Sequence, residues 1–416
     1  MWSVGDTLVL LAIFAILCWL YCDTTEGFED ISFKKDKEYK KQLSLLAAAY
    51  EGVKRRPITE MLPSSGMPES HQCLINFYAL GCRLPGYIGP TTNGYMDPDV
   101  GVRQAVNAGC RVFVLDIDYI DECGSDNIYP RFNVRDQQGK IVQRLSSDQP
   151  VCNGPGSSNL ATICEKINYY AFADSCQNAT DPVIIVLYFL RKPKGSYKSQ
   201  NVLDYYSKVA KCLAPFANRL LGNEINGGTF YRQKQENRLL MNRITDYNGR
   251  VLIFSNANTI GFREVQTYSP ADDLDYLVNL RLGYTQKPLG ITEGEASFGV
   301  LESAENYMII PSDRSDAVLE STKLKWTLCL PQDPLQTVPA ATYQSITGTF
   351  GVNCVPVMIF DRANCKYMFE KPLFSLYSFL PKPLNLRYIK PPTVIPGAPS
   401  KAMDAKGGML REPVVG

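Results

Sequence analysis

The chain has 416 residues, which is enough for one large domain such as an α/β barrel of roughly 250 residues. Its formal net charge of +1 and its ordinary composition give no sign of nucleic-acid binding. The only histidine is His71, so any mechanism that needs two imidazoles is excluded. Because His71 precedes the first expected strand, we predict a structural role for it.

The first expected element is a membrane anchor. An apolar run from Leu8 to Tyr21 approaches the ~20 residues that span a bilayer. No Lys or Arg precedes this run and no small-x-small cleavage site follows it, which argues against a cleaved signal peptide. We therefore predict a transmembrane anchor at residues 1–22 that contacts the membrane through residues 4–21.

Lysines predict the orientation of this anchor. None precedes the apolar run, and five follow it, at Lys34, Lys35, Lys37, Lys40 and Lys41. The positive-inside rule then places the soluble body on the cytoplasmic side. A cytoplasmic side would leave the sequon at Asn178 unglycosylated and would favour reduced thiols.

The 13 cysteines do not predict a metal site. Cys18 and Cys22 lie in or beside the apolar run, which leaves 11 in the body. None of them forms a C-x-x-C pair, and one histidine cannot complete a zinc set. Buried free thiols and disulfides both remain open.

Residues 23–70 are expected to form a charged linker that contains a short helix over residues 34–49. Apolar runs and helical stretches then alternate. The expected strands are residues 74–79, 111–117, 182–189, 250–255, 274–282, 324–330 and 354–360, and the expected helices are residues 98–108, 160–172 and 203–220. This alternation predicts a parallel sheet, and eight such strands close a TIM-type (β/α)8 barrel, which we assign to residues 71–390.

The C-terminal segment has a different composition. Residues 391–399 are too rich in proline for a helix or a sheet. Residues 391–416 are therefore expected to be an extended tail. It is either a plain terminus or an arm that binds a neighbouring protein.

Three stretches of the body resemble the catalytic barrel of the eukaryotic-type phosphoinositide-specific phospholipases C. The stretch 106–116 has a helix end, a Gly-Cys-Arg turn and a strand that closes in Leu-Asp. The stretch 181–187 resembles the next strand of the family, and 374–387 resembles its closing segment around Lys-Pro and Leu-Arg. In this order they cover about residues 74–390, and they imply a phospholipase C-like barrel.

The resemblance implies two acid–base histidines on opposite sides of a phosphodiester, and a calcium ion held by Asn, Asp and Glu. The first histidine and its neighbouring asparagine fall near Arg83, which cannot act as a base. The calcium aspartate is kept as Asp116, whereas two calcium glutamates fall on Val114 and Tyr188. No histidine follows Asp118 where the second one should lie.

The two lysines that would bind the headgroup fall on Phe254 and Asn256. Loss at the base, metal and substrate positions predicts a catalytically inactive barrel, tethered to a membrane, that acts as a structural or binding module. We expect no catalytic residue, no metal and no other cofactor. The proline-rich tail, with residues 407–411, resembles tails of proteins from large nucleocytoplasmic DNA viruses. That resemblance implies a virion or host intracellular membrane and a bridge from membrane to capsid.

Two alternatives stay open. In the first, Asp116 and Asp118 lie on one strand face and act with Arg83 and calcium as a divergent phosphodiesterase on phosphoinositides or glycerophosphodiesters. In this sequence the same carboxylates could instead cap helices or pair with Arg103 and Arg111. In the second alternative, the barrel binds a lipid headgroup without turnover, although the missing lysines argue against selectivity for phosphoinositides.

Overall fold

The computed structural model describes most of the body of the chain. The described residues are 37–90, 95–119, 133–135, 141–144, 159–221, 233–234, 236, 238–265, 268–284, 299–331, 333 and 336–390. The predicted anchor at residues 1–22 and the predicted tail at residues 391–416 lie outside these ranges. Within them, no helix is both long and apolar enough to cross a bilayer.

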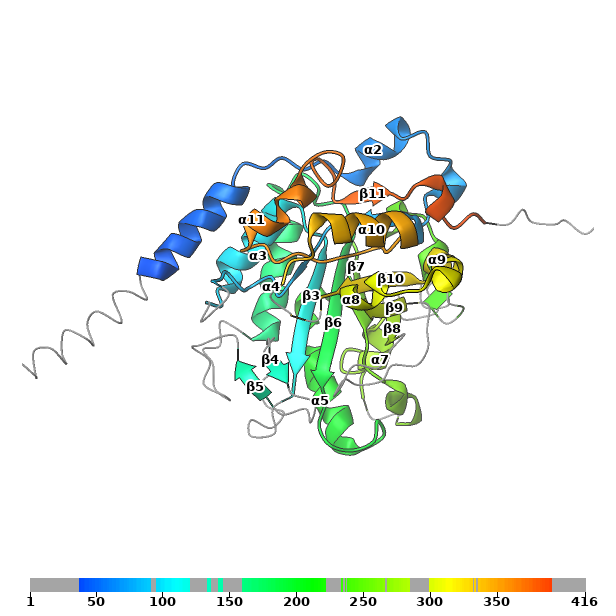
Figure 1. Cartoon of the computed structure of the whole chain (residues 1–416). Helices are drawn as coiled ribbons and strands as arrows, with labels where there is room; N and C mark the ends of the chain where they lie inside the picture. Colours follow the sequence, from blue (N-terminus) through cyan, green and yellow to red (C-terminus); the bar gives the residue numbers. More distant parts are fainter. Residues whose placement is uncertain are drawn as a thin grey trace, which may run out of the picture.

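A parallel sheet that curls on itself forms the centre of the molecule (Figure 1). Its seven strands, in spatial order, are β10 (Trp326–Leu330), β9 (Gly299–Ser303), β8 (Leu280–Tyr284), β7 (Val251–Ser255), β6 (Val183–Arg191), β3 (Val112–Asp118) and β2 (Gly81–Arg83). Every neighbouring pair is parallel. This arrangement follows from the apolar runs of β3 and β6, which suit strands buried on both faces.

Residues 354–357 close the ring. They form parallel bridges to β10, between Cys354 and Leu328, and to β2, between Val357 and Cys82. A proline inside this segment has no N–H to donate, so its pairing is limited to isolated bridges. The predicted parallel barrel is therefore confirmed, with the segment predicted at residues 354–360 in the eighth position.

Helices surround the barrel (Figure 1). They are α2 (Ile58–Ser64), α3 (Pro98–Ala108), α4 (Leu160–Ala171), α5 (Gln200–Lys211), α7 (Leu274–Leu277), α8 (Ala304–Met308), α9 (Ser312–Leu324), α10 (Ala340–Phe350) and α11 (Arg362–Cys365). Single 3-10 turns include η1 (Glu69–His71) and η2 (Leu74–Asn76). Helix α3 has the predicted bounds because Asp97 caps it, accepting a hydrogen bond from Val100 N at 3.1 Å, and Gly109 ends it with φ 95°.

Three expected elements need correction. The run 74–79 is not a barrel strand, because it divides into η2 and the short strand β1 (Phe77–Ala79), which pairs antiparallel with β11 (Phe379–Pro381). The run 274–282 divides into α7 and β8, and the helix expected at 203–220 ends with α5. The strands β4 (Asn133–Arg135) and β5 (Ile141–Arg144) form an antiparallel hairpin that was not expected.

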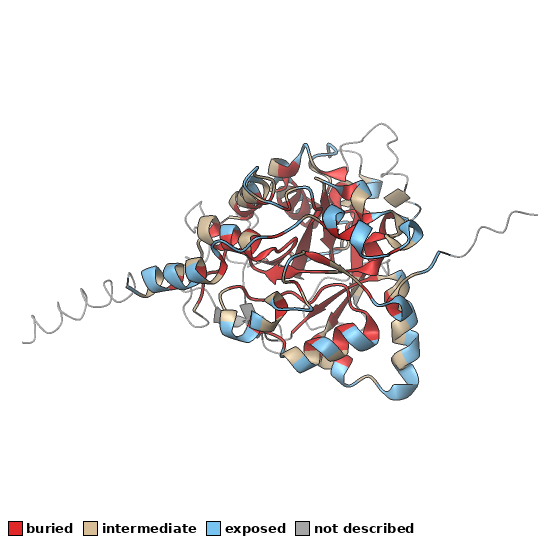
Figure 2. Cartoon of the chain, turned by 90° about the horizontal axis from the view of Figure 1, so that it is seen from above, coloured by how far each residue is buried: buried red, intermediate tan, exposed pale blue. Residues whose placement is uncertain are grey.

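The strands alternate their side chains between two apolar cores. Val112 and Val114 of β3 face a core inside the barrel, together with alternate residues of β6 and β7. Phe113, Leu115 and Ile117 face the second core, between the barrel and its helices. Figure 2 shows these buried strands inside a layer of partly exposed helices. The alternation directs Asp116 and Asp118 to the inner face.

Residues 37–50 form a helix that packs on the barrel. Leu46 and Tyr50 are buried, the Tyr39 hydroxyl donates to Asp97 at 2.6 Å, and the Tyr50 hydroxyl donates to Ile359 O at 2.8 Å. Part of the segment predicted as a linker, residues 23–70, therefore contributes to the core. In Figures 1 and 2 this helix and the C-terminal end of the described chain lie on opposite sides of the molecule.

The described cysteines are free thiols. They are Cys73, Cys82, Cys110, Cys164, Cys176, Cys212, Cys329, Cys354 and Cys365. Seven of the nine are buried, as expected for small apolar side chains.

Candidate functional site

The C-terminal ends of β2, β3, β6 and β7 meet at one rim of the barrel, the rim that carries chemistry in enzymes of this architecture. Arg83 ends β2, and Asp116 and Asp118 lie at the end of β3. In the parallel ladder Asp116 is opposite Tyr188 of β6, and Arg83 is opposite Val114. The rim thus brings together the three residues of the predicted alternative site.

Arg83 and Asp116 form a two-pronged ion pair. Arg83 Nε lies 2.9 Å from Asp116 Oδ1, and Arg83 Nη2 lies 2.6 Å from Asp116 Oδ2. The guanidinium carbon also lies 5.6 Å from the ring centroid of Tyr188. Arg83 is 5% exposed and Asp116 is 0% exposed. This fork geometry uses both oxygens of the carboxylate and is the strongest arrangement available to an Arg–Asp pair.

The charges of the pair depend on each other. Burial alone would lower the pKa of Arg83, but the Asp116 carboxylate outweighs it and the net direction is upward. Burial raises the pKa of the Asp116 carboxyl, Arg83 opposes that rise, and Asp118 adds to it. Arg83 therefore remains a cation and cannot accept a proton as a base.

Asp118 lies one step further along the inner face. It is buried, and its Oδ1 is 3.9 Å from Nε of Arg191, whose Nε donates to Tyr119 O at 2.8 Å. The pairing that we considered with Arg111 does not form, because Arg111 donates to Ala171 O and to Asn178 Oδ1, both at 2.8 Å. Asp116 and Asp118 do share a face, as their spacing predicts.

Three residues that replace the calcium and headgroup ligands of the resembled family contribute to packing instead. Val114 and Phe254 are buried in the inner core, and the Phe254 ring meets Trp326 edge-on at 4.9 Å between centroids. Asn256 is fully buried, accepting from Phe189 N at 2.7 Å and donating to Phe189 O at 2.8 Å. Asn256 thus clamps the end of β7 to β6.

Burial also raises the pKa of Tyr188, so its hydroxyl stays protonated. The described residues of this rim do not fit a calcium ion, which takes six to eight oxygen ligands. Both Asp116 oxygens accept from Arg83, and the positions of the two glutamates carry Val114 and Tyr188. Among the residues that the structure describes, no group of three or more His, Cys, Asp or Glu could hold a metal.

His71 does not belong to the strands that form this rim. It ends η1, ahead of β1 in the chain, and its carbonyl accepts from Asn76 Nδ2 at 2.8 Å. The structural role expected for the His71 side chain stays a prediction, since this bond involves only its backbone.

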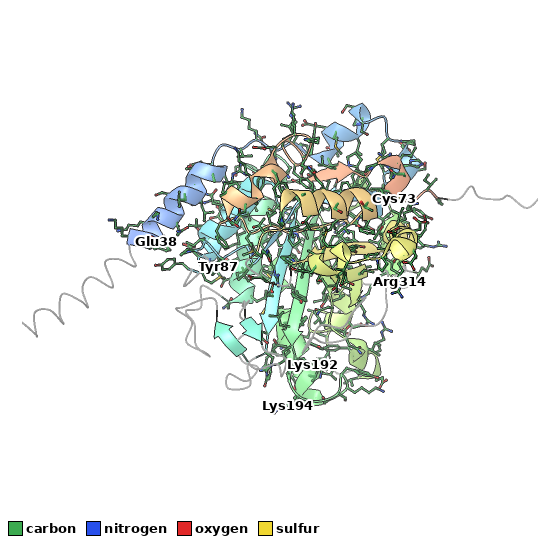
Figure 3. All side chains as sticks on the ribbon, viewed as in Figure 1. Glu38, Cys73, Tyr87, Lys192, Lys194 and Arg314 are labelled. Atoms are coloured by element: carbon green, nitrogen blue, oxygen red, sulfur yellow. The ribbon has the colours of Figure 1, made fainter. Side chains whose placement is uncertain are left out.

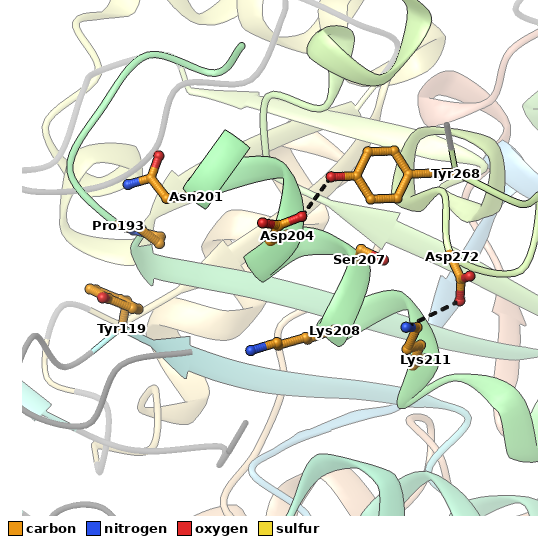
Figure 4. A pocket seen from close by; sticks show the side chains of 9 residues that line it. All are labelled: Tyr119, Pro193, Asn201, Asp204, Ser207, Lys208, Lys211, Tyr268 and Asp272. Atoms are coloured by element: carbon orange, nitrogen blue, oxygen red, sulfur yellow. Dashed lines mark hydrogen bonds and ion pairs between the residues drawn. The ribbon is translucent and has the colours of Figure 1, made fainter. Parts of the chain in front are cut away.

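A cavity of about 380 Å³ lies elsewhere, beside α5 (Figure 4). It is lined by Tyr119, Pro193, Asn201, Asp204, Ser207, Lys208, Lys211, Tyr268 and Asp272. The Tyr268 hydroxyl donates to Asp204 at 2.7 Å, and Lys211 lies 4.0 Å from Asp272. Arg83, Asp116 and Asp118 do not line this cavity, whereas Tyr119, the residue after Asp118, does.

Comparisons with known proteins agree with this architecture. No family model and no curated protein matches the chain. The solved PLC21 of S. officinalis is 15% identical with a TM-score of 0.50, and the match covers 78% of this chain and 39% of that one. The fold is that of a phospholipase C-like TIM barrel.

Two further solved structures have lower scores. PLC21 of L. pealei is 15% identical with a TM-score of 0.49, over 78% of this chain and 39% of that chain. The calcium-dependent phosphoinositol-specific phospholipase C of Pseudomonas sp is 12% identical with a TM-score of 0.44, over 76% and 97%. The phospholipase C-like barrel thus spans well under half the length of the PLC21 chains, and at these identities the likeness concerns the fold alone.

Proposed function

We propose that this chain is a non-hydrolytic phospholipase C-like barrel, tethered to a membrane by residues 1–22, that acts as a structural or binding module. The observation that carries the proposal is the buried ion pair of Arg83 and Asp116, covered by Tyr188. It stands where the family resemblance places a histidine base and a calcium ligand.

The chemistry of phosphodiester cleavage needs groups that this rim does not offer in its described part. A general base must titrate near neutral pH, and Arg83 does not. A calcium ligand must have free oxygens, and both oxygens of Asp116 accept from Arg83. Opening the pair would leave two desolvated charges, which costs several kcal/mol. The pair therefore serves as a buried structural pair rather than as a resting catalytic site.

The positions of the two ends support a bridging role. The helix of residues 37–50 and the C-terminal end of the described chain lie on opposite sides of the barrel (Figure 1). A chain anchored before the helix could thus present its residues 391–416 to a protein layer on the far side. We propose that this layer is a capsid, which would make the membrane that of a virion.

A turnover assay tests the proposal. Full-length protein in mixed micelles is incubated with phosphatidylinositol or with glycerophosphoinositol, in the presence of calcium, magnesium or manganese, and products are followed by ³¹P NMR. We expect no product above the rate with buffer alone. The Asp116→Ala variant is the matched control, because a contaminating enzyme would be unaffected by it.

The alternative, a divergent phosphodiesterase, has one observation in its favour. Asp116 and Asp118 share the inner face of β3, with Arg83 and Arg191 beside them. In that case Asp116 or Asp118 would act as the acid, Arg83 would hold the phosphate, and calcium could assist. Turnover that is lost in both Asp116→Ala and Asp118→Ala would favour this alternative over the inactive barrel.

A further inference from the structure

The helix of residues 37–50 has one exposed face. Its other face is buried on the barrel through Gln42, Leu46 and Tyr50. The outward residues recur at helical spacing and form a continuous stripe, which we call the basic stripe. It consists of Lys37, Lys40, Lys41, Ser44, Leu45 and Ala48.

This part of the chain is far more basic than the rest. Residues 37–56 contain six Lys and Arg residues and two Glu residues, a net charge of +4, whereas the whole chain carries +1. Of the six cations only Arg55 is buried. Glu38, near the outer end of the helix (Figure 3), lies 3.6 Å from Lys41 and accepts from Gln42 at 2.7 Å. The described residues of this segment thus carry an excess of exposed positive charge, three lysines of which lie on the basic stripe.

Apolar side chains stand among these charges. Leu45 is 54% exposed in the middle of the stripe, and Val53 is 37% exposed just beyond the helix. A row of lysines with an exposed leucine is the pattern of helices that lie on anionic lipid, where ammonium groups meet headgroups and the apolar side chain enters the interface. An acidic protein surface would account for the lysines without needing an exposed leucine.

The helix is held firmly enough to transmit this contact to the barrel. Tyr39 and Tyr50 hydrogen-bond to Asp97 and Ile359 O, and the Arg362 guanidinium lies 5.3 Å from the Tyr50 ring centroid. A surface that binds the helix would therefore also fix the orientation of the barrel.

We propose that the basic stripe lies on the anionic headgroups of the membrane that holds the chain. This inference rests on the proposed function, in which residues 1–22 tether the chain to a membrane. Three lysines then meet the lipid surface, Leu45 inserts between headgroups, and the barrel is oriented rather than free to swing. The contact is electrostatic in large part, so added salt weakens it.

Lysine footprinting of the full-length protein tests this orientation. The protein is reconstituted into vesicles of phosphatidylcholine, with or without phosphatidylserine, and labelled with a membrane-impermeant amine-reactive ester before mass spectrometry. The side chain of Lys41 is 63% exposed, and Lys211 and Lys366 are matched controls at 63% and 68%. We expect labelling of Lys37, Lys40 and Lys41 to fall severalfold with phosphatidylserine, and that of Lys211 and Lys366 to stay constant.

A pair of variants sharpens the test. Lys37→Gln with Lys41→Gln should reduce the protection of Lys40, whereas Lys211→Gln with Lys366→Gln should leave it unchanged. Equal labelling of Lys41 in both vesicle types, or equal protection of Lys41 and Lys366, would overturn the inference. Failure of the tether gives a different result, because the protein would then not float with vesicles of phosphatidylcholine alone. Protection by an added acidic polypeptide but not by phosphatidylserine would assign the stripe to a protein partner and refute the lipid contact.

Discussion

The buried ion pair of Arg83 and Asp116 can be tested by a double-mutant cycle. Replacing Asp116 with Leu leaves the Arg83 guanidinium at 5% exposure without its carboxylate. Removing one partner of such a buried pair costs about 3–5 kcal/mol. The double variant Arg83→Met with Asp116→Leu removes both charges and keeps the volume, so its stability should lie within about 1 kcal/mol of the wild type or above it.

The cycle is measured by urea unfolding, with Trp326 as a native probe, since this side chain is buried in the inner core beside Phe254. A surface pair provides the control: Lys323 and Glu320 lie 2.7 Å apart, Glu320 is largely exposed, and its replacement should change stability by less than about 1 kcal/mol. If Asp116→Leu lowered the free energy of unfolding by less than about 1 kcal/mol, or if the effects of the two single variants were simply additive, the Arg83–Asp116 pair would not be a coupled structural pair.

Three further changes probe the same barrel. Lys382 is fully buried, and burial lowers its pKa from 10.5 to about 7, so at this site the folded state binds fewer protons than the unfolded chain. Between pH 7 and 10.5 the wild type should therefore gain about 4 kcal/mol of stability relative to Lys382→Met in urea titrations, and a constant difference between the two proteins would contradict the burial of a lysine here. Asn256→Ala removes both hydrogen bonds to Phe189 and should cost about 2–4 kcal/mol, whereas unchanged stability would contradict the clamp. A Cβ at Gly101 would collide with the carbonyl oxygen of Pro85, so Gly101→Ala should destabilise by about 1–3 kcal/mol, and calorimetry that finds no loss would show that α3 can shift.

Much of the fold could be predicted because several signals act locally. Asp97, Pro98 and Gly109 start and end α3, and the continuous apolar runs of β3 and β6 identify buried parallel strands. Prediction was wrong where a local signal was missing. No breaker separates α7 from β8 within residues 274–282, and β9 is a short strand with a polar end, so periodicity did not reveal it.

The candidate site could be predicted only in part. The two-residue period of a strand places Asp116 and Asp118 on one face, and the structure bears this out. The partner of Asp116 was not predictable, because it depends on the register between β2 and β3 and on burial at the rim. Arg191 was missed for the same reason, although a basic residue just beyond an expected strand end was the available signal. From the sequence, Asn256 was noted only because it replaces a headgroup lysine of the resembled family. Its two hydrogen bonds to the Phe189 backbone depend on how β6 and β7 lie side by side, which the sequence does not show.

The most direct test of the inactive barrel is the rate of phosphatidylinositol hydrolysis by the full-length protein with calcium, compared between wild type and Asp116→Ala. Our account predicts that both rates equal that of buffer alone. A wild-type rate above that level that Asp116→Ala abolishes would contradict it.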